Sequence, residues 1–563
     1  MSHRPSLLRR RSRVRGRLFP FALLLLAFAA GCDGGDSPKS GGAAKNEVVI
    51  GIGQEPDSLD PLFGEMMAGA EIRGAIFRTL AMRDNTLALR PVMAEEIPTL
   101  ENGGLRLLPG GGMRSTWKIR KGYKWDDGTP VTAGDFIFAH RVIMTKGIPV
   151  ITRDVDRRIT KMEAPDPYTL VVTWKQRFAR ANDNVHFPLP RHILEPVLKK
   201  GPRAYHESFF NTKPVGNGPY RLTAWEPGSL LALERNPHFP DKPGRFEKIT
   251  YMVIPNTGAL EVNLAAGGVQ GISPVGFTFD QALDMEKRRG AEIRTHFTPA
   301  MIWEHIDFNH DSPLLRDKRV RQALTYATNR AGIVRALFAG RQKVAHSWLP
   351  PRHYGYNPNV KKYPYDPGRA KRLLEEAGWT PGPKGVRRNA AGLEMRLVLM
   401  TTSGNKVREK IQQLIRADWR AVGVEVTIRN QPAKVYFGET VRYRKFPHLA
   451  MYAWLFNPST DGEAYWTKGN IPSEKNNWQG QNNPGFVNDE IDRIDRLIPT
   501  VIDKKERTRL FHKEQEIWTE ELPTLPLYFR VDVTATRPDF LNWKPTGTDT
   551  PITWNAESWG FVK

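Results

Sequence analysis

The first residues to test for chemistry are those that a hydrolase would need. Ser273 lies in residues 271–276, a glycine-flanked segment that is one residue too long for the Gly-x-Ser-x-Gly pattern of a serine nucleophile. Pro274 follows the serine and has no backbone N–H, so the donor that an oxyanion hole uses there is missing. His186 and His192 are six residues apart across two prolines, which does not place both on one helix face, as a zinc motif requires. These residues therefore do not predict a catalytic or metal site.

A pair of carboxylates, Asp126 and Asp127, offers a second catalytic hypothesis, because two carboxyl groups can act as general acid and base. Gly128 and Pro130 follow them, however, and both are typical of a tight turn. Side chains at neighbouring turn positions diverge. We therefore interpret this segment as a turn that leads into a helix capped by Thr132, and we predict neither an enzyme nor a cofactor.

The only cysteine, Cys32, indicates a different chemistry. Seven arginines before residue 18 are followed by an apolar run over residues 18–30, the layout of a secretory signal peptide. The run is shorter than the ~20 residues of a membrane-spanning helix. Ala30 and Gly31 precede Cys32, which resembles the lipobox of bacterial lipoproteins, where the cysteine is lipidated and becomes the mature N-terminus. A plain signal peptide cleaved nearby is the alternative.

These features divide the N-terminus into a lipoprotein signal peptide (1–31) and a flexible, Gly/Ser-rich tether (32–45). Asp33 follows the cysteine directly, and in the lipoproteins that this segment resembles, such an aspartate favours retention on the inner membrane. The protein is therefore expected at the periplasmic face of the bacterial inner membrane. Once Cys32 carries lipid, no thiol remains for a disulfide or a cysteine metal site.

The composition describes a large, basic and globular chain. Of 563 residues, roughly 520 follow the tether, which implies more than one lobe because single cores stop growing at about 250–300 residues. The formal net charge is +23, but the Lys and Arg residues interleave with acids along the whole chain. A nucleic-acid binder concentrates its charge on one arm or helix. We therefore predict no nucleic-acid partner.

The elements that must position a site alternate between strand and helix. The pattern predicts strands at 47–52, 116–120, 220–224 and 230–235, and a helix around 135–143. Asp366 and Pro367 mark the start of an amphipathic helix. Further on, a strand (395–400), a helix (407–415) and a strand (424–428) predict a parallel pair with a right-handed crossover. A helix near 504–520 and a strand at 524–529 follow.

Several motifs in this order resemble the family 5 extracellular solute-binding proteins, the receptors of peptide, nickel and opine ABC importers. The most specific is TWKIRKGYKWDDGTPVTAGDF at residues 116–136. The resemblance covers essentially the whole chain. The other matching segments are VGNGPY (215–220), RNP (235–237), FN (308–309), RDKRVRQAL (316–324), YDP (365–367), LLEEAGW (373–379) and ELPTLPLY (521–528).

The resemblance implies an α/β fold of two lobes, periplasmic-binding-protein-like (class II), with an extra subdomain in lobe I and the ligand cleft between the lobes. Lobe I is expected to be discontinuous, over residues 46–85, 211–298 and 526–563. The extra subdomain is expected over 86–210 and lobe II over 299–525. Ligand would be enclosed by hinge closure.

In peptide-binding members of this family, an aspartate three residues after an aromatic pairs with the free α-amino group of the ligand. Trp454 matches the aromatic here, but the matching position is Asn457, which cannot neutralise an ammonium group. Asp461 or Glu463 would supply the charge from the same loop, or the ligand lacks a free amine.

Aromatic residues around this segment suit a cleft that stacks on its ligand, although half of them are equally expected in the core. The predicted ligand-binding residues are Trp454, Phe456, Asn457, Asp461, Tyr465, Trp466 and Trp478.

The resulting prediction is a monomeric, lipid-anchored receptor that captures a peptide or peptide-like solute and delivers it to ABC permease and ATPase subunits. Two other classes stay open: an exported envelope hydrolase, and a structural or chaperone-like lipoprotein. A sugar, an opine or a nickel chelate is the alternative ligand. The resemblance does not reveal the ligand's identity or length.

Overall fold

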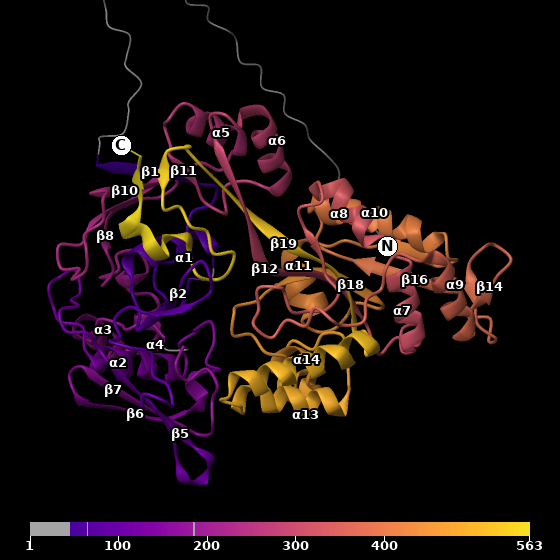
Figure 1. Cartoon of the computed structure of the whole chain (residues 1–563), viewed down its shortest axis with the longest axis horizontal. Helices are drawn as coiled ribbons and strands as arrows, with labels where there is room; N and C mark the ends of the chain where they lie inside the picture. The colour runs from indigo at the N-terminus through magenta and orange to yellow at the C-terminus, as the bar shows by residue number, and fades with distance from the viewer. Residues whose placement is uncertain (1–45, 65, 184–185, 563) are drawn as a thin grey trace, which may run out of the picture. The chain divides into compact units, whose positions relative to one another are not determined.

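The structure of the chain is a computed structural model that describes residues 46–64, 66–183 and 186–562 (Figure 1). The predicted signal peptide (1–31), the lipidated Cys32 and the tether (32–45) lie outside these residues. Within the part that is described, no helix combines the length and the apolar character needed to cross a membrane.

One mixed sheet of 11 strands organises the fold. Two long strands, β12 (Arg294–Phe308) and β19 (Thr524–Thr536), lie antiparallel at its centre. Along the sheet the order is β17 (Glu425–Ile428), β16 (Arg396–Met400), β18 (Leu449–Leu455), β12, β19, β11 (Gly271–Ile272), β1 (Glu47–Ile52), β10 (Lys248–Val253), β9 (Leu230–Arg235) and β8 (Tyr220–Glu226), and β13 (Lys343–Val344) pairs with β19.

The two long strands pass through both lobes of the protein. The first half of β12, from Arg294 to Pro299, pairs with the end of β19, which also pairs with β11. The second half of β12, from Ile302 onward, pairs with β18. Between Pro299 and Trp303 the register shifts, as in a β-bulge. The strand ladder therefore continues from one lobe into the other with a local interruption between them.

Separate hydrophobic cores lie in the two lobes. One core is built from residues between 48 and 251 together with residues 540–559, so it joins both ends of the described chain. Another core uses residues between 301 and 529, with Trp303, Trp348, Trp419 and Trp518 fully buried in it. The chain is therefore an α/β protein of two lobes. The domain boundaries given above stay predictions.

The first core is covered by helices α1 (Met67–Ile76), α2 (Ala133–Met144), α3 (Arg191–Leu198) and α4 (Pro202–His206), and it includes the sheet β4 (Leu105–Leu107), β5 (Met113–Lys118), β7 (Thr169–Trp174) and β6 (Ile159–Asp166). Helices α5 (Thr257–Ala265) and α6 (Phe279–Arg289) pack in a third cluster. Two small antiparallel pairs belong to the same lobe: the hairpin of β2 (Ala81–Arg83) and β3 (Leu89–Pro91), and the pair of β20 (Phe540–Leu541) with β21 (Gly560–Phe561).

The segment that holds the carboxylate pair is a turn, as predicted. Gly128 has a φ of 91°, in the left-handed region that favours glycine, and Trp125 N donates to Thr129 O at 2.8 Å. The two carboxylates have different partners. Asp126 accepts from the backbone of Gly216, and Asp127 pairs with His192 Nε2 at 2.6 Å. They therefore do not form an acid–base pair.

The second lobe follows the predicted strand–helix–strand order. β16, α10 (Lys406–Arg420) and β17 form a parallel pair with a helical crossover, which confirms the prediction. α9 (Pro367–Glu376) begins at Asp366, whose side chain accepts a hydrogen bond from Arg369 N at 2.8 Å. The other elements here are α7 (Lys318–Tyr326), α8 (Arg330–Phe338), β14 (Thr380–Pro381), β15 (Arg387–Arg388), α11 (Ala433–Val435), α12 (Glu463–Trp466), α13 (Asp489–Leu497) and α14 (Lys504–Glu521).

Candidate ligand-binding site

Two cavities, of about 240 and 480 Å³, share the side chains of Phe187 and Asp549 and form one groove, which we call the interlobe groove. Its walls come from the β2–β3 hairpin, from residues 143–156, from residues 183 and 186–187, from the loop after β18 and from a turn near the C-terminus. The loop after β18 belongs to the second lobe and lines the smaller cavity, so segments of both lobes meet there, whereas the larger cavity is lined from the first lobe alone. Ligand sites are commonly found in such a place.

Arg83 lies at the polar end of the groove, at the tip of the β2–β3 hairpin. The turn of this hairpin is closed by Asp84, whose carboxylate accepts a hydrogen bond from the backbone of Thr86 at 2.8 Å. Arg83 Nη1 donates to the carbonyl oxygen of Leu87 at 2.9 Å. The guanidinium group is therefore held by the turn that precedes β3.

Arg83, Asp183 and Ser459 form a hydrogen-bonded triangle in the groove. Arg83 Nη2 forms an ion pair with Asp183 Oδ2 and donates to Ser459 Oγ at 3.0 Å. Ser459 Oγ in turn donates to Asp183 Oδ2 at 2.6 Å. The other carboxylate oxygen, Asp183 Oδ1, is buried and has no hydrogen-bond partner among the described residues. This carboxylate therefore keeps part of its negative charge without a donor next to the groove.

Asn457 lines the groove as well, but its side-chain oxygen is used within its own loop. Asn457 Oδ1 accepts from Ser459 N at 2.9 Å, which closes an Asx turn. Asn457 N donates to Thr460 Oγ1, also at 2.9 Å. Asn457 carries no charge to neutralise a cation, and its side-chain oxygen already has a donor.

Asp549 is the residue that both cavities share. It lies in a tight turn in which Thr546 Oγ1 donates to Thr550 O. Gly547 in this turn has a φ of 67°, and a Cβ there would lie 2.3 Å from the carbonyl oxygen of Pro299. The turn therefore requires glycine at this position, and it fixes the point at which Asp549 enters the groove.

The environment of Asp549 shifts its ionisation. Its side chain reaches solvent, yet protein surrounds it closely. Desolvation raises the pKa of Asp549 to about 6, although Arg83 acts in the opposite direction, and the charge of Asp183 raises this pKa further. Within the described part of the chain, Asp549 is thus a carboxylate that lacks a cation of its own.

The other end of the groove is apolar. Leu62, Ile143, Val150 and Val155 line it, together with Ile151, which is 51% exposed. Asp156 also lines this cavity and pairs with His140 Nδ1 at 2.6 Å. This end can accommodate an apolar side chain or chain segment of a ligand.

Trp454 and Tyr465 lie beside the loop after β18 rather than on the walls of the groove. Both are partly buried against the core of the second lobe, and their rings pack edge to face at 5.3 Å between centroids. Asp461 accepts a hydrogen bond from Glu463 N at 3.3 Å. Among the predicted ligand-binding residues, Asn457 is the one that contributes to the groove wall.

Phe456 and Trp466 are core residues in this structure. They are 1% and 2% exposed and contact Trp303 and Trp348 in the second lobe. Burial of this kind leaves no surface for a ligand, so the proposed site does not include them. Trp478 lies in a different place, packed against Tyr443 at 5.2 Å between ring centroids.

The sequence did not point to Arg83, Asp183 or Asp549. Each lies in a short polar segment that matches no motif, and the three segments are far apart along the chain. The run TGTDTP at 546–551 is typical of a turn, but nothing in it indicates a groove. The fold alone brings these residues together.

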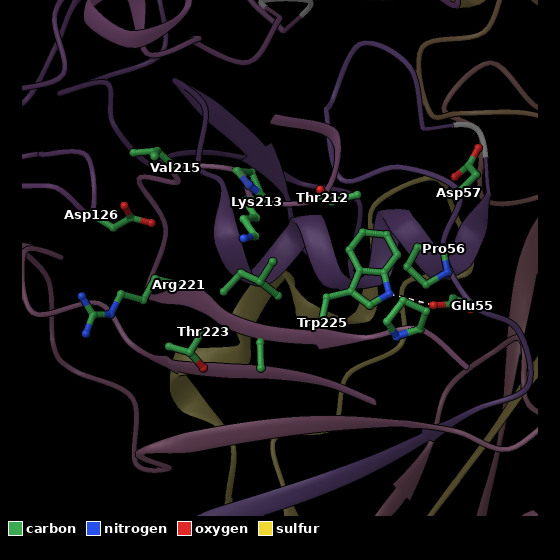
Figure 2. A pocket seen from close by; sticks show the side chains of 14 residues that line it. Glu55, Pro56, Asp57, Asp126, Thr212, Lys213, Val215, Arg221, Thr223 and Trp225 are labelled. Carbon is green, nitrogen blue, oxygen red and sulfur yellow. Dashed lines mark hydrogen bonds between the residues drawn. The ribbon is translucent and has the colours of Figure 1, made fainter. Parts of the chain in front are cut away.

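Another cavity, of about 890 Å³, is a less suitable site (Figure 2). All of its lining residues come from one lobe and the adjoining turn at Asp126, with none from residues 299–525. Its most prominent polar contact is internal, because Trp225 Nε1 donates to Glu55 Oε1 at 2.7 Å (Figure 2). The Glu55 carboxylate also accepts from Gly228 N at 3.1 Å.

The residues considered for catalysis do not form an active site. Ser273 is fully buried. His186 interacts with the carbonyl oxygen of Phe136 at 2.9 Å, and His192 with Asp127, so the two histidines have separate partners. Within the described ranges, no group of three or more His, Cys, Asp and Glu side chains is arranged to hold a metal ion.

Comparison with known proteins gives a consistent result. The family model of the bacterial extracellular solute-binding proteins, family 5 (middle), matches residues 110–476. The oligopeptide-binding protein AppA of Bacillus subtilis is 26% identical over 528 residues, with 90% of this chain and 92% of AppA covered. Protein XP55 of Streptomyces lividans is 30% identical over 415 residues, with 72% of each chain covered.

Among solved structures, an oligopeptide-binding protein from Thermus thermophilus in complex with a pentapeptide is 33% identical to this chain. The TM-score is 0.74, and the match covers 92% of this chain and 96% of that one. The two-lobe α/β architecture is therefore that of the periplasmic binding proteins, as the motifs predicted. The chain belongs to the bacterial extracellular solute-binding proteins of family 5.

Proposed function

We propose that this protein is the receptor of an ABC importer and that it captures a peptide or peptide-like solute in the interlobe groove. Family membership supports the role of a binding receptor. The similarity to oligopeptide-binding proteins of Bacillus subtilis and Thermus thermophilus supports a peptide. The single observation that carries the proposal is the groove itself, which is built from segments of both lobes and joins a charged end to an apolar end.

The mechanism that follows is capture by closure. A solute held by the first lobe would be covered by the loop after β18, because Ser459 in that loop already bonds to Arg83 and Asp183 across the groove. Ligand would then shift the population toward the closed arrangement, as far as its affinity for the two states differs. No bond is made or broken, so we propose that the protein is a binding protein without catalytic activity.

We further propose that lipidated Cys32 anchors the protein as a monomer at the periplasmic face of the inner membrane, next to its permease. One acyl chain alone gives only weak membrane binding, so several chains on one cysteine would be required. Mass spectrometry of the mature N-terminus tests this proposal. An N-terminus other than diacylated or triacylated Cys32 would contradict it.

A thermal-shift screen tests the ligand class. The full chain is heated with pentapeptides of random sequence, with sugars, with an opine and with a Ni²⁺–histidine complex. A ligand at 100 times its Kd stabilises the native state by about 2.7 kcal/mol, which raises the melting temperature. The proposal predicts the shift for peptides. A shift with sugar, opine or nickel chelate alone would assign another ligand, and turnover of a model ester or peptide would assign an enzyme.

A further inference from the structure

The charge of the interlobe groove is opposite to that of the protein. The whole chain carries a formal net charge of +23. The charged side chains that line the groove, however, are three aspartates, Asp156, Asp183 and Asp549, and one arginine, Arg83. His186, which also lines it, is largely buried, and desolvation lowers its pKa, so it adds no positive charge at neutral pH. The groove therefore has a local excess of negative charge.

The partners of these aspartates show where the excess lies. Asp156 is paired with His140 Nδ1 at 2.6 Å. Asp183 uses Oδ2 for Arg83 and Ser459, while its buried Oδ1 has no donor among the described residues. A buried carboxylate oxygen without a donor is costly. The uncompensated charge is thus at the polar end.

Asp549 adds a second carboxylate at the same end. It lines the same 240 Å³ cavity as Asp183, and the two lie close enough for the charge of one to raise the pKa of the other. Of the residues that the structure describes, Arg83 is the only cation that lines this cavity, and it is already paired with Asp183. A cation entering the cavity would compensate the negative charge that remains.

We propose that the groove selects solutes with a positively charged amino group, and that Asp549 accepts this group while the nearby charge of Asp183 attracts it. The inference rests on the proposed function and names the chemical class of its ligand. The ammonium group donates a hydrogen bond to the Asp549 carboxylate and is attracted by the charge of Asp183 beside it, while the rest of the solute extends toward the apolar end at Val150 and Val155. In this chain the first lobe and the C-terminal turn thus supply the negative charge that Asn457 cannot provide.

The smaller cavity is too small for a whole peptide, so the two ends of the groove are expected to bind different parts of the ligand. A space of about 240 Å³ suits one amino group and its neighbouring atoms, whereas the adjoining 480 Å³ accommodates an apolar segment. Asp549 stands where the two meet. The solute is therefore expected to be amphipathic, with its amino group at one end.

The test compares free and N-acetylated forms of the same peptides. Lysine-free pentapeptides with an amidated C-terminus are titrated into the full chain by isothermal calorimetry at pH 7.5. Acetylation removes the positive charge and leaves the side chains unchanged. We expect acetylation to weaken binding at least tenfold, and we take the ratio of the two Kd values as the readout.

Two isosteric variants test which carboxylates recognise the amino group of the ligand. Asp549→Asn and Asp183→Asn should each bring the Kd ratio close to one, mainly by weakening the free peptide. Ser459→Ala is the matched control for Asp183, because it removes a contact to that carboxylate but keeps both charges. It is expected to weaken both peptide forms equally and to keep the ratio. Asp461→Asn tests the aspartate in the loop after β18 and should also keep the ratio.

The outcomes separate the inference from the proposed function. If both peptide forms bind equally to the wild-type protein, the inference is wrong and the peptide receptor stands. If the ratio is large and survives Asp549→Asn and Asp183→Asn but is lost in Asp461→Asn, the amino group lies elsewhere and the inference is wrong. If neither form of any pentapeptide binds, the proposed function fails, and the inference fails with it.

Discussion

Ser459 Oγ donates a 2.6 Å hydrogen bond to Asp183 Oδ2 and so connects the loop after β18 to the segment that precedes α3. The same loop makes two further polar contacts with this side. Arg158 pairs with Glu463 at 2.9 Å, and Arg180 Nη1 donates to the carbonyl oxygen of Ser459 at 3.3 Å. Each contact is partly exposed and is worth little alone. Together they form a clasp across the groove.

The clasp predicts a specific effect of mutation. Ser459→Ala combined with Arg158→Ala should weaken peptide binding several-fold, because the closed state loses contacts that the open state never had. The free energy of unfolding in urea should change by less than about 1 kcal/mol. Arg203→Ala is the control, since Arg203 pairs with Glu207 on the surface. Equal loss of affinity in the control would contradict the clasp.

The ionisation of Asp549 predicts how binding depends on pH. The pKa of Asp549 is raised to about 6 by desolvation, so this carboxyl is protonated in the free protein below that pH. An ammonium ligand requires the ionised form. The Kd of a free-amine peptide should therefore rise by up to about tenfold per pH unit below pH 6, as calorimetry can measure.

The groups that face Asp549 are Arg83, Asp183, Asp156 and His186, and Asp549→Asn distinguishes their contributions. In this variant, and with the N-acetylated peptide, the Kd should stay nearly constant between pH 5 and 7. A pH dependence that persists in Asp549→Asn would assign the titration to another group of the groove.

A buried ion triad in the second lobe predicts a large loss of stability. Glu304 on β12 accepts from Arg408 at 2.6 Å and from Arg530 at 2.9 Å, and it is fully buried. Glu304→Gln would leave the buried Arg408 guanidinium group without its counter-ion and would remove the ion pair of Arg530. We expect the free energy of unfolding to fall by about 3–5 kcal/mol in urea. Glu474→Gln, at an exposed position, should leave it unchanged.

The same triad sets an acid limit. Burial alone raises the pKa of Glu304, but Arg530 and Arg408 outweigh it and hold the value at about 2. Because this pKa is depressed, the stabilisation is complete above the unfolded value of about 4.3 and is lost as the pH falls toward 2. Between pH 5 and 2.5, the free energy of unfolding measured in urea should fall less steeply with decreasing pH in Glu304→Gln than in the wild-type protein.

Two aromatic residues of the second lobe should behave differently when truncated. Phe456 is 1% exposed in the core, and Phe456→Ala should lower the free energy of unfolding by about 3–5 kcal/mol. Trp454 is only partly buried and stands beside the loop after β18. Trp454→Ala should therefore cost less stability and weaken peptide binding. Equal destabilisation by both, with unchanged binding in Trp454→Ala, would make Trp454 a core residue.

A pair of buried acids in the second lobe predicts a pH trend of stability opposite to that of Glu304. Asp495 on α13 and Glu514 on α14 are fully buried, and desolvation raises the pKa of both, with the charge of Glu514 adding to the shift of Asp495. The folded protein then holds a proton that the unfolded chain releases above about pH 4. This part of the stability falls as the pH rises.

Asp495→Asn tests this trend because it keeps the shape of the side chain and removes one titrating group. The decline of stability above about pH 4.5 in urea unfolding should become shallower in this variant. An identical pH profile for variant and wild type would show that the pair does not contribute.

The sequence predicted local structure well where local rules determine it. The N-cap at Asp366 and the crossover from β16 to β17 were confirmed, because capping and hydrophobic periodicity depend on residues within a few turns of each other. The turn at Gly128 was confirmed for the same reason. The two lobes followed from the family motifs rather than from any local pattern.

The groove was only partly predictable. Asn457 was expected there and lines it, whereas Phe456 and Trp466 turned out to be buried. An aromatic side chain suits a core and a cleft equally, so its type could not decide between them. Asp183 and Asp549 are 366 positions apart and carry no motif. Their meeting depends on long-range packing.

The interruption between Pro299 and Trp303 has a mechanical consequence for the sheet that joins the lobes. On either side of it, β12 is paired with β19, whereas Ala300, Met301 and Ile302 have no partner in β19. A strand pair resists bending where its backbone hydrogen bonds are intact and bends more easily where they are missing. We therefore expect these residues to act as the hinge between the lobes, with the pairing of β12 and β19 on either side preserved during each cycle of uptake.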